Sequence, residues 1–246
     1  MRIPLLLLLI CSILLNCSTQ KRILTDLDKI GLKGQVKYLK FESHLTEKDG
    51  ELTSNQNEGK GIIIDNEFFF NENGMISEQR QYSKSELSQI FVFEYDNHNL
   101  LILKNYFNPS HVLVMKSKFE NTFNSKGKII KQFEFRATNN SFMDSTKITY
   151  QKMPHKTMEF SYNQNGELEK MTYIQSIFGS NLPKSIMEYR NGLMDKQLLV
   201  DSNGSIISSS NIICLGFDKI GNCIKLKTKD NSSAEEYTNA EIKYYK

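Results

Sequence analysis

A short pattern of apolar and polar positions recurs along most of this chain. An aromatic or aliphatic residue is followed by a polar residue, mostly Asn or Asp, then two mostly polar residues, Gly, one variable residue and usually an aliphatic one. Copies begin at Phe70, Tyr95, Phe123, Tyr162, Val200 and Phe217, and a degenerate copy begins at Thr46. Each copy predicts a β-hairpin, because Asn or Asp opens a type I turn and Gly takes the left-handed position of a bulged three-residue loop.

The spacing of the predicted turns indicates how the strands are organised. The turn residues are Gly50, Gly74, Asn99, Gly127, Gly166, Gly192, Gly204 and Gly221, and Asn191-Gly192 forms a tighter turn than the others. Most neighbours are about 25 residues apart, which is two strands plus two turns. The longer gap between Gly127 and Gly166 leaves room for an extra hairpin, with Ile148 to Tyr150 as a strand and a turn near Pro154-His155.

This loop type also fixes the register of each hairpin. It predicts the cross-strand pairs Phe70 with Ile76, Tyr95 with Leu101, Phe123 with Ile129, Tyr162 with Leu168, Val200 with Ile206, and Phe217 with Cys223. Strand alternation adds Phe68, Phe93, Phe160, Leu198 and Leu215 to the same core face. The opposite face is partly apolar, as at Phe69 and Ile130. We expect it to be covered by curling or packing of the sheet; an exposed binding surface is the alternative.

The first part of the repeat region has a different pattern. Leu24, Leu27 and Ile30 are three residues apart and predict a short helix before Gly31, and the alternation from Gln35 to Phe41 predicts an entering strand. The fold class is therefore all-β, a repeated antiparallel hairpin meander of roughly 14 to 18 strands over residues 35–246. No second globular domain is visible.

The N-terminal segment indicates export. Met1 and Arg2 precede an apolar run, Ile3 to Leu15, whose length as a helix, about 20 Å, is too short to span a bilayer. The ending Leu14-Leu15-Asn16-Cys17 resembles a bacterial lipobox; a plain signal peptide cut nearby is the alternative. We expect residues 1–16 to be a lipoprotein signal peptide, Cys17 to carry the lipid, and residues 17–34 to form a tether and short helix. The predicted location is the outer membrane of the cell envelope, with the protein facing the periplasm rather than the cell surface.

Composition limits the classes of function. The chain has 246 residues, of which 39% are hydrophobic and 24% charged, and a formal net charge of +3. This apolar content is sufficient for a core and excludes a disordered polymer. The small positive charge gives no reason to expect a nucleic-acid partner.

The sequence contains no catalytic motif, and we assign no catalytic, metal or cofactor residue. His44, His98, His111 and His155 lack metal-ligand spacing and are expected to be solvated loop or strand residues. Asp26 and Asp28, or Glu235 and Glu236, resemble paired carboxylates but are expected to be solvated. The prediction is a non-catalytic binding or structural scaffold for a protein, peptide or glycan. The alternatives are an envelope hydrolase with a site built from scattered Asp, Glu and His residues, and an immunity or inhibitor protein acting against a toxin.

The register also predicts whether the two cysteines that follow Cys17, Cys214 and Cys223, can form a disulfide. With Phe217 opposite Cys223, Cys214 lies opposite Leu226 and alternates onto the other face. A disulfide needs Cβ vectors that converge. The register therefore predicts that Cys214 and Cys223 remain unbonded, whereas a four-residue loop would permit the bond.

The repeated unit over residues 41–229 resembles the YD repeat of Rhs-type proteins. The stretch from Leu27 to Lys37 is similar to the N-terminal segment of bacterial envelope lipoproteins that carry such hairpins. The resemblance implies a β-sheet scaffold in the cell envelope and no catalytic residues. Full Rhs proteins are far longer and enclose cargo, and seven or eight units are too few for such a cocoon.

Overall fold

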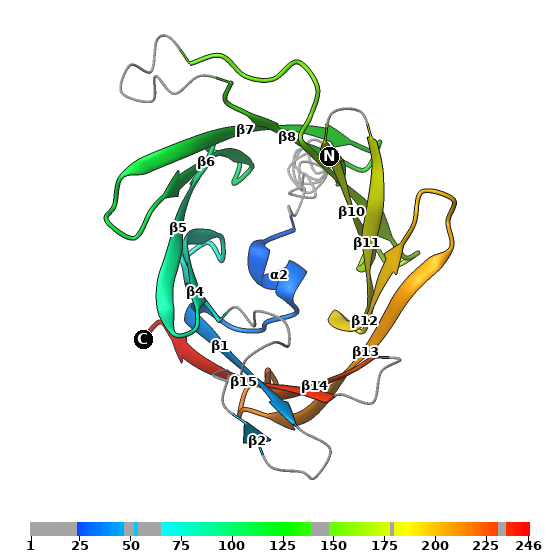
Figure 1. Ribbon diagram of the computed structural model, residues 1–246. Helices are drawn as coiled ribbons and strands as arrows, with labels where there is room; N and C mark the ends of the chain where they lie inside the picture. Colours follow the sequence, from blue (N-terminus) through cyan, green and yellow to red (C-terminus); the bar gives the residue numbers. More distant parts are fainter. Residues whose placement is uncertain (1–23, 47–51, 54–64, 139–147, 178–179, 231–234) are drawn as a thin grey trace, which may run out of the picture.

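Strands joined by tight turns make up almost all of the described chain. The computed structural model describes residues 24–46, 52–53, 65–138, 148–177, 180–230 and 235–246. Fourteen strands form one antiparallel sheet in sequence order, and pairing of β1 with β15 closes it into a barrel (Figure 1). The elements are α2 (Asp26–Ile30), β1 (Val36–Thr46), β2 (Leu52–Thr53, paired only with β1), β3 (Asn66–Phe70), β4 (Ile76–Ser83), β5 (Glu86–Tyr95), β6 (Leu101–Phe107), β7 (Leu113–Phe123), β8 (Ile129–Arg136), β9 (Lys156–Tyr162), β10 (Leu168–Ile177), β11 (Ser180–Arg190), β12 (Leu193–Val200), β13 (Ile206–Phe217), β14 (Cys223–Lys229) and β15 (Glu235–Tyr244).

The predicted hairpin meander is confirmed, together with its register. All six predicted cross-strand pairs are present, from Phe70 opposite Ile76 to Phe217 opposite Cys223. The turn residues in the described chain have positive φ, as a left-handed turn position requires: Gly74, Asn99, Gly127, Gly166, Gly192, Gly204 and Gly221. Gly50 lies outside the described residues.

One hairpin of this type escaped the sequence pattern. Asn108-Pro109-Ser110-His111 forms the same loop, with His111 at φ 60° in the position of Gly, and Phe107 lies opposite Leu113. The structure differs from the expectation of an extra hairpin after Gly127, with a strand at Ile148 to Tyr150. In the described residues of that region, only an isolated bridge between Ala137 and Tyr150 extends the pairing of β8 with β9.

The two faces of the sheet differ in composition. Leu39 and Phe41 of β1 face the inside of the barrel, where they pack in a cluster with Leu27 of α2. Lys40 and Glu42 alternate with them on the outside and form an ion pair. Further ion pairs follow the outer face, including Glu78–Arg80, Lys118–Glu120, Lys131–Glu159, Lys227–Glu235 and Glu241–Lys243. The outer face therefore carries paired charges, in contrast to the apolar cluster inside.

Four predicted core positions are exposed. Phe123 and Ile206, each beside its turn, are 42% and 59% exposed, and Leu215 and Phe217 are 47% and 55% exposed. The inner wall at β13 and β14 carries Ile212, Cys214 and Leu226 instead. Register shifts on both sides of Gly216 change the alternation here, which explains the difference.

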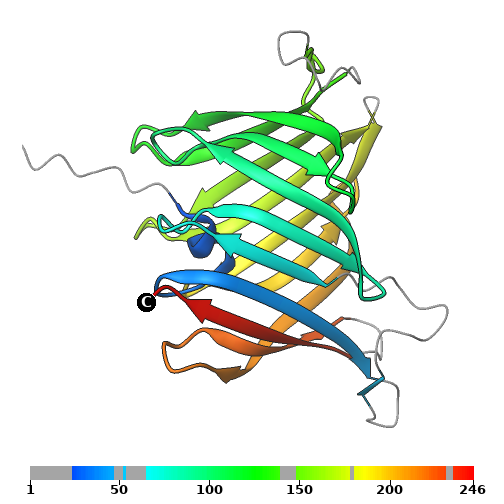
Figure 2. The same ribbon diagram turned by 90° about the vertical axis from the view of Figure 1, so that its left-hand side faces the viewer.

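The helix α2 lies within the ring of strands, near one end of the barrel (Figures 1 and 2). We call this end the helix rim; it is formed by the turns at Asn71–Met75, Asp96–Leu100, Asn124–Lys128, Asn163–Glu167, Asn191-Gly192 and Asp218–Asn222. Most of the repeated hairpin turns therefore gather around one short helix. In the described part of the chain, no helix is long and apolar enough to cross a membrane.

Candidate ligand-binding site

Local sequence accounts for the position and length of α2. Thr25 caps its first turn, because its hydroxyl accepts a hydrogen bond from the Asp28 N–H while the Asp28 carboxylate accepts from the Thr25 N–H. Gly31 ends the helix with φ 80°, and a Cβ at this position would lie 2.5 Å from the carbonyl oxygen of Gly192. The helix therefore ends in direct contact with the β11–β12 turn.

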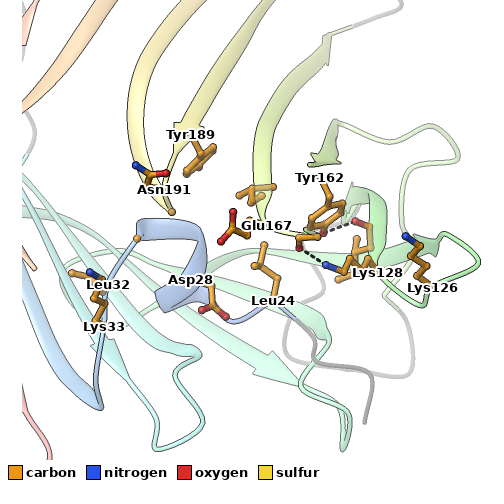
Figure 3. Close-up of a pocket in the computed structure, with 15 residues that line it drawn as sticks. Leu24, Asp28, Leu32, Lys33, Lys126, Lys128, Tyr162, Glu167, Tyr189 and Asn191 are labelled. Carbon is orange, nitrogen blue, oxygen red and sulfur yellow. Dashed lines mark hydrogen bonds between the residues drawn. The ribbon is translucent and has the colours of Figure 1, made fainter. Parts of the chain in front are cut away.

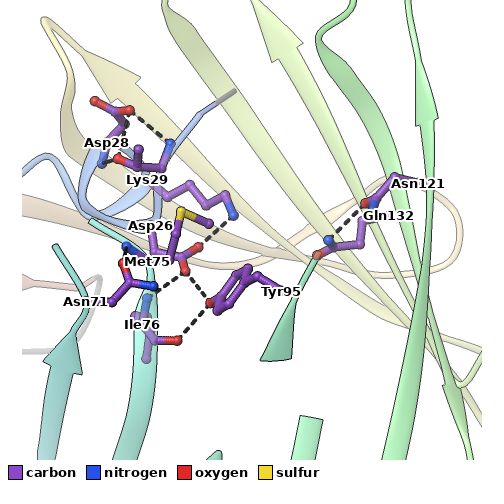
Figure 4. A network of polar contacts seen from close by, with 10 residues as sticks. Asp26, Asp28, Lys29, Asn71, Met75, Ile76, Tyr95, Asn121 and Gln132 are labelled. Atoms are coloured by element: carbon purple, nitrogen blue, oxygen red, sulfur yellow. Dashed lines mark hydrogen bonds and ion pairs between the residues drawn. The ribbon is translucent and has the colours of Figure 1, made fainter. Parts of the chain in front are cut away.

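A buried carboxylate fixes α2 to the inner wall (Figure 4). Asp26 is 9% exposed and contacts the Lys29 ammonium at 2.7 Å, the Tyr95 hydroxyl at 2.6 Å and the Ile76 N–H at 3.0 Å. Burial raises the pKa of Asp26, but these three partners outweigh it and hold the pKa below its ordinary value. The expectation that Asp26 is solvated is therefore wrong, because two of its partners, Tyr95 and Ile76, come from strands distant in sequence.

A second fixed point follows the helix. Asn222 is fully buried and bonds the backbone of Lys33, accepting from its N–H at 2.6 Å and donating to its carbonyl at 3.0 Å. Asn222 also contacts the Tyr244 hydroxyl at 2.6 Å. The segment from α2 to β1 is thus tied to two separate turns of the helix rim.

Between α2 and three of these turns lies a pocket of about 380 Å³, which we call the rim pocket (Figure 3). Its size falls in the range of small-ligand sites, roughly 300–1,000 Å³. Leu24 and Leu32 line it on the helix side, and Ile129, Leu168 and Tyr189 line it on the sheet side. The last three also belong to a buried cluster of the barrel interior, so the pocket is continuous with the apolar inner wall.

Polar groups surround this apolar floor. Lys33, Lys126 and Lys128 line the pocket together with Asp28 and Glu167. The Lys128 ammonium lies 4.9 Å from the ring centroid of Tyr162 and donates a hydrogen bond to the Gly166 carbonyl.

The two tyrosines of the pocket remain neutral near pH 7. Burial raises the pKa of Tyr162 to about 12 and that of Tyr189 further above its ordinary value. The Tyr162 hydroxyl donates to the Ile129 carbonyl at 2.8 Å. The arrangement can hold a ligand through apolar contacts, hydrogen bonds and cationic groups. Within the described ranges, no group of three or more His, Cys, Asp or Glu side chains is placed to hold a metal ion.

A smaller pocket of about 270 Å³ lies on the other side of Gly31 and Leu32. A disulfide between Cys214 and Cys223 forms part of its wall, with the two Cα atoms 5.8 Å apart. The prediction that these cysteines remain unbonded is wrong. The predicted pairs Phe217–Cys223 and Cys214–Leu226 are both present, but two register shifts beside Gly216 lie between them and bring both sulfur atoms to one side.

The structure gathers some of the predicted turn residues into the site and leaves others away from it. Gly166 and Gly192 line the rim pocket, whereas Gly204 belongs to a turn at the opposite end of the barrel. Cys17 lies outside the described residues. The sequence did not indicate Leu24, Tyr162 or Tyr189 as ligand contacts, although an aromatic residue before each turn was a visible signal.

Comparisons with known proteins give structural similarities at low sequence identity. No protein-family model matches the chain, and no curated protein matches it. A porin-like protein from Bacteroides uniformis is similar in structure, with 10% identity, a TM-score of 0.42, and coverage of 85% of this chain and 96% of that chain. A DUF1329 family protein from Desulfovibrio piger has 8% identity, a TM-score of 0.31 and coverage of 88% of each chain. A LolA superfamily protein from Nitrosomonas europaea has 10% identity, a TM-score of 0.31, and coverage of 89% and 90%.

Proposed function

We propose that this protein is a non-catalytic, lipid-anchored binding protein of the cell envelope, which holds a small or extended apolar ligand in the rim pocket. The observation that carries the proposal is the rim pocket itself. It has an apolar floor, neutral tyrosines and lysines at its edge, and a helix fixed beside it by hydrogen bonds from Tyr95 and Ile76 to the buried Asp26 carboxylate. These are the features of a preformed ligand site.

Two observations support the envelope location. The Cys214–Cys223 disulfide suits an oxidising compartment. The ion pairs on the outer face suit contact with water on the outside of the barrel, which favours attachment through a lipid on Cys17 over insertion of the barrel itself. An outer-membrane anchor with the barrel in the periplasm satisfies both.

Binding at the rim pocket is tested by a fluorescent apolar probe, 1-anilinonaphthalene-8-sulfonate, titrated into the purified protein. Glu167→Trp places a large ring at the pocket wall, and Glu169→Trp, two residues along and outside the pocket, is the matched control. We expect Glu167→Trp to weaken probe binding about tenfold or more, equivalent to about 1.4 kcal/mol, and Glu169→Trp to leave it unchanged. Equal binding by both variants would contradict the proposed site.

The anchor is tested separately in cells. Cys17→Ala is expected to abolish labelling by a fatty-acid analogue and to release the protein from the membrane fraction. Ser18→Ala, next to it, is the control and should label normally. Equal labelling of the wild-type protein and Cys17→Ala would refute the lipid anchor.

A further inference from the structure

A group of cations lies on the inner wall of the barrel, away from the rim pocket. The register places Lys104 of β6 opposite Ser117 of β7, Ser117 opposite Arg136 of β8, and Glu134 of β8 opposite Lys156 of β9. These side chains therefore share the inner face. The charged groups that act on Lys104 are Glu134, Arg136 and Lys156. Together with Lys104 itself, three cations therefore lie near one carboxylate.

That carboxylate is already bound by neutral donors. Oε1 of Glu134, a residue only 2% exposed, accepts hydrogen bonds from the Tyr106 hydroxyl at 2.5 Å and the Ser117 hydroxyl at 2.8 Å. By contrast, Arg136 Nε is buried and has no hydrogen-bond partner in the described part of the chain. The same holds for Nε2 of His155, next to Lys156, so the expectation that His155 is solvated is wrong. A buried donor without a partner is costly, which indicates that a further acceptor completes the cluster.

Aromatic rings partly offset the cost of burying the Lys104 ammonium. Its ammonium lies 4.2 Å from the ring centroid of Phe91, 4.7 Å from that of Tyr106 and 5.4 Å from that of Phe93. Ring faces attract a cation without neutralising it. The cluster therefore keeps an excess of positive charge beside an apolar surface.

An apolar wall connects this cluster to the rim pocket. Along β9, Lys156, Met158, Phe160 and Tyr162 alternate onto the inner face, and six residues of strand span about 20 Å. Met171 and Tyr173 of β10 lie opposite Phe160 and Met158 and widen the wall. Methionine side chains adapt to flexible apolar chains, so this wall suits an extended hydrocarbon.

We propose that the ligand is an amphipathic molecule with a long apolar chain and one anionic group, whose carboxylate or phosphate binds Arg136, Lys156 and Lys104 while the chain lies along β9 and β10 toward the rim pocket. This inference rests on the proposed function and names its ligand class. A free fatty acid and a lipid phosphate share the required chemistry.

The test compares head groups on one chain length by isothermal titration calorimetry of the full mature protein. Dodecanoate, dodecyl phosphate, dodecanol and inorganic phosphate are the probes. We expect the two anionic amphiphiles to bind at least about tenfold more tightly than dodecanol, because hydrogen bonds to charged groups contribute more than neutral ones. The stronger of the two anionic probes identifies the head group.

Variants locate the anionic group. Arg136→Gln with Lys156→Gln should weaken dodecanoate at least about tenfold and leave dodecanol unchanged. Lys131→Gln, on β8 but on the outer face, is the matched control and should change neither. Equal affinities for dodecanol and dodecanoate would overturn the anion site and leave the proposed binding function standing. Failure of every amphiphile to bind would overturn both.

The pH dependence supplies an independent readout. Burial lowers the pKa of Lys104 to about 8, with Glu134 opposing the shift and Lys156 and Arg136 adding to it, while Tyr106 has a raised pKa and stays neutral. Dodecanoate affinity should therefore fall as pH rises through about 8, as Lys104 loses its proton. Lys104→Gln should remove this step, and an unchanged pH profile in that variant would contradict a role for Lys104.

Discussion

At the scale of single residues, Asp26 shows what a sequence does and does not reveal about burial. It lies between Thr25 and Leu27 and close to a second carboxylate, Asp28, and such carboxylates near a terminus are normally solvated. Its environment is instead set by Tyr95, which is 69 residues away, and by the backbone of Ile76. Local patterning predicts helix α2 and its end before Gly31, but the partner that buries a side chain comes from tertiary contacts.

The first prediction concerns this carboxylate. Asp26→Asn should lower the free energy of unfolding by about 1–3 kcal/mol at pH 7, because charge-assisted hydrogen bonds to Tyr95 and Lys29 are replaced by neutral ones. Urea denaturation measures the change. Asp195→Asn, which alters an ion pair with Arg190 at the surface, is the control and should cost far less.

The same substitution has a defined pH dependence. The pKa of Asp26 is lower in the folded protein than its ordinary value of 3.8. Its stabilising effect is therefore fully present above about pH 5 and is lost as pH falls through the folded-state pKa. The difference between the wild-type protein and Asp26→Asn should shrink at pH 3 and below, and a difference that grows on acidification would contradict the assigned ion pair.

At the scale of elements, the hairpins were predictable because each is specified within seven residues. The six cross-strand pairs follow from turn type alone, and His111 escaped only because it occupies the position that Gly usually fills. The disulfide was not predicted because register shifts in β13 override the simple alternation. Gly216 was the available signal, since an isolated glycine inside a strand often marks a bulge.

The second prediction separates the conformational role of a turn glycine from its contact with α2. Gly74 and Gly204 both have positive φ; a Cβ at Gly74 would lie 3.0 Å from Leu27 Cδ1, whereas a Cβ at Gly204 would meet nothing within 4 Å. Gly204→Ala should cost about 1–2 kcal/mol through left-handed strain alone. Gly74→Ala should cost about 1–3 kcal/mol more, because Leu27 must move. Equal losses in urea denaturation would show that α2 does not pack against this turn.

At the scale of the whole molecule, closure of the sheet depends on the pairing of β1 with β15, whose residues lie about 200 positions apart in the sequence. The hairpin pattern specifies neighbours along the chain, and an open sheet would satisfy it equally. Closure also decides function, because it encloses the inner wall, the rim pocket and the cationic cluster. The seam is therefore the feature on which both the proposed site and the inferred ligand class depend.

The third prediction tests that seam. Glu42 and Asn239 are directly paired across β1 and β15, and both are exposed. Paired Cα atoms in antiparallel strands lie about 4.5–5.5 Å apart, within disulfide range, whereas 13 strand spacings, about 60 Å, would separate them in an open sheet. Glu42→Cys with Asn239→Cys should therefore crosslink under mild oxidation and raise the free energy of unfolding by about 2–4 kcal/mol.

Non-reducing peptide mapping identifies the crosslink, alongside the native Cys214–Cys223 bond. Glu42→Cys with Lys196→Cys is the control, because Lys196 lies on β12, four strands around the barrel from β1, about 19 Å along the sheet. That pair should stay reduced under the same conditions. If the Glu42→Cys, Asn239→Cys protein folds but yields no crosslink, the sheet is open at this seam. The inner wall would then be a face exposed to solvent, and a ligand enclosed between α2 and the strands would have no basis.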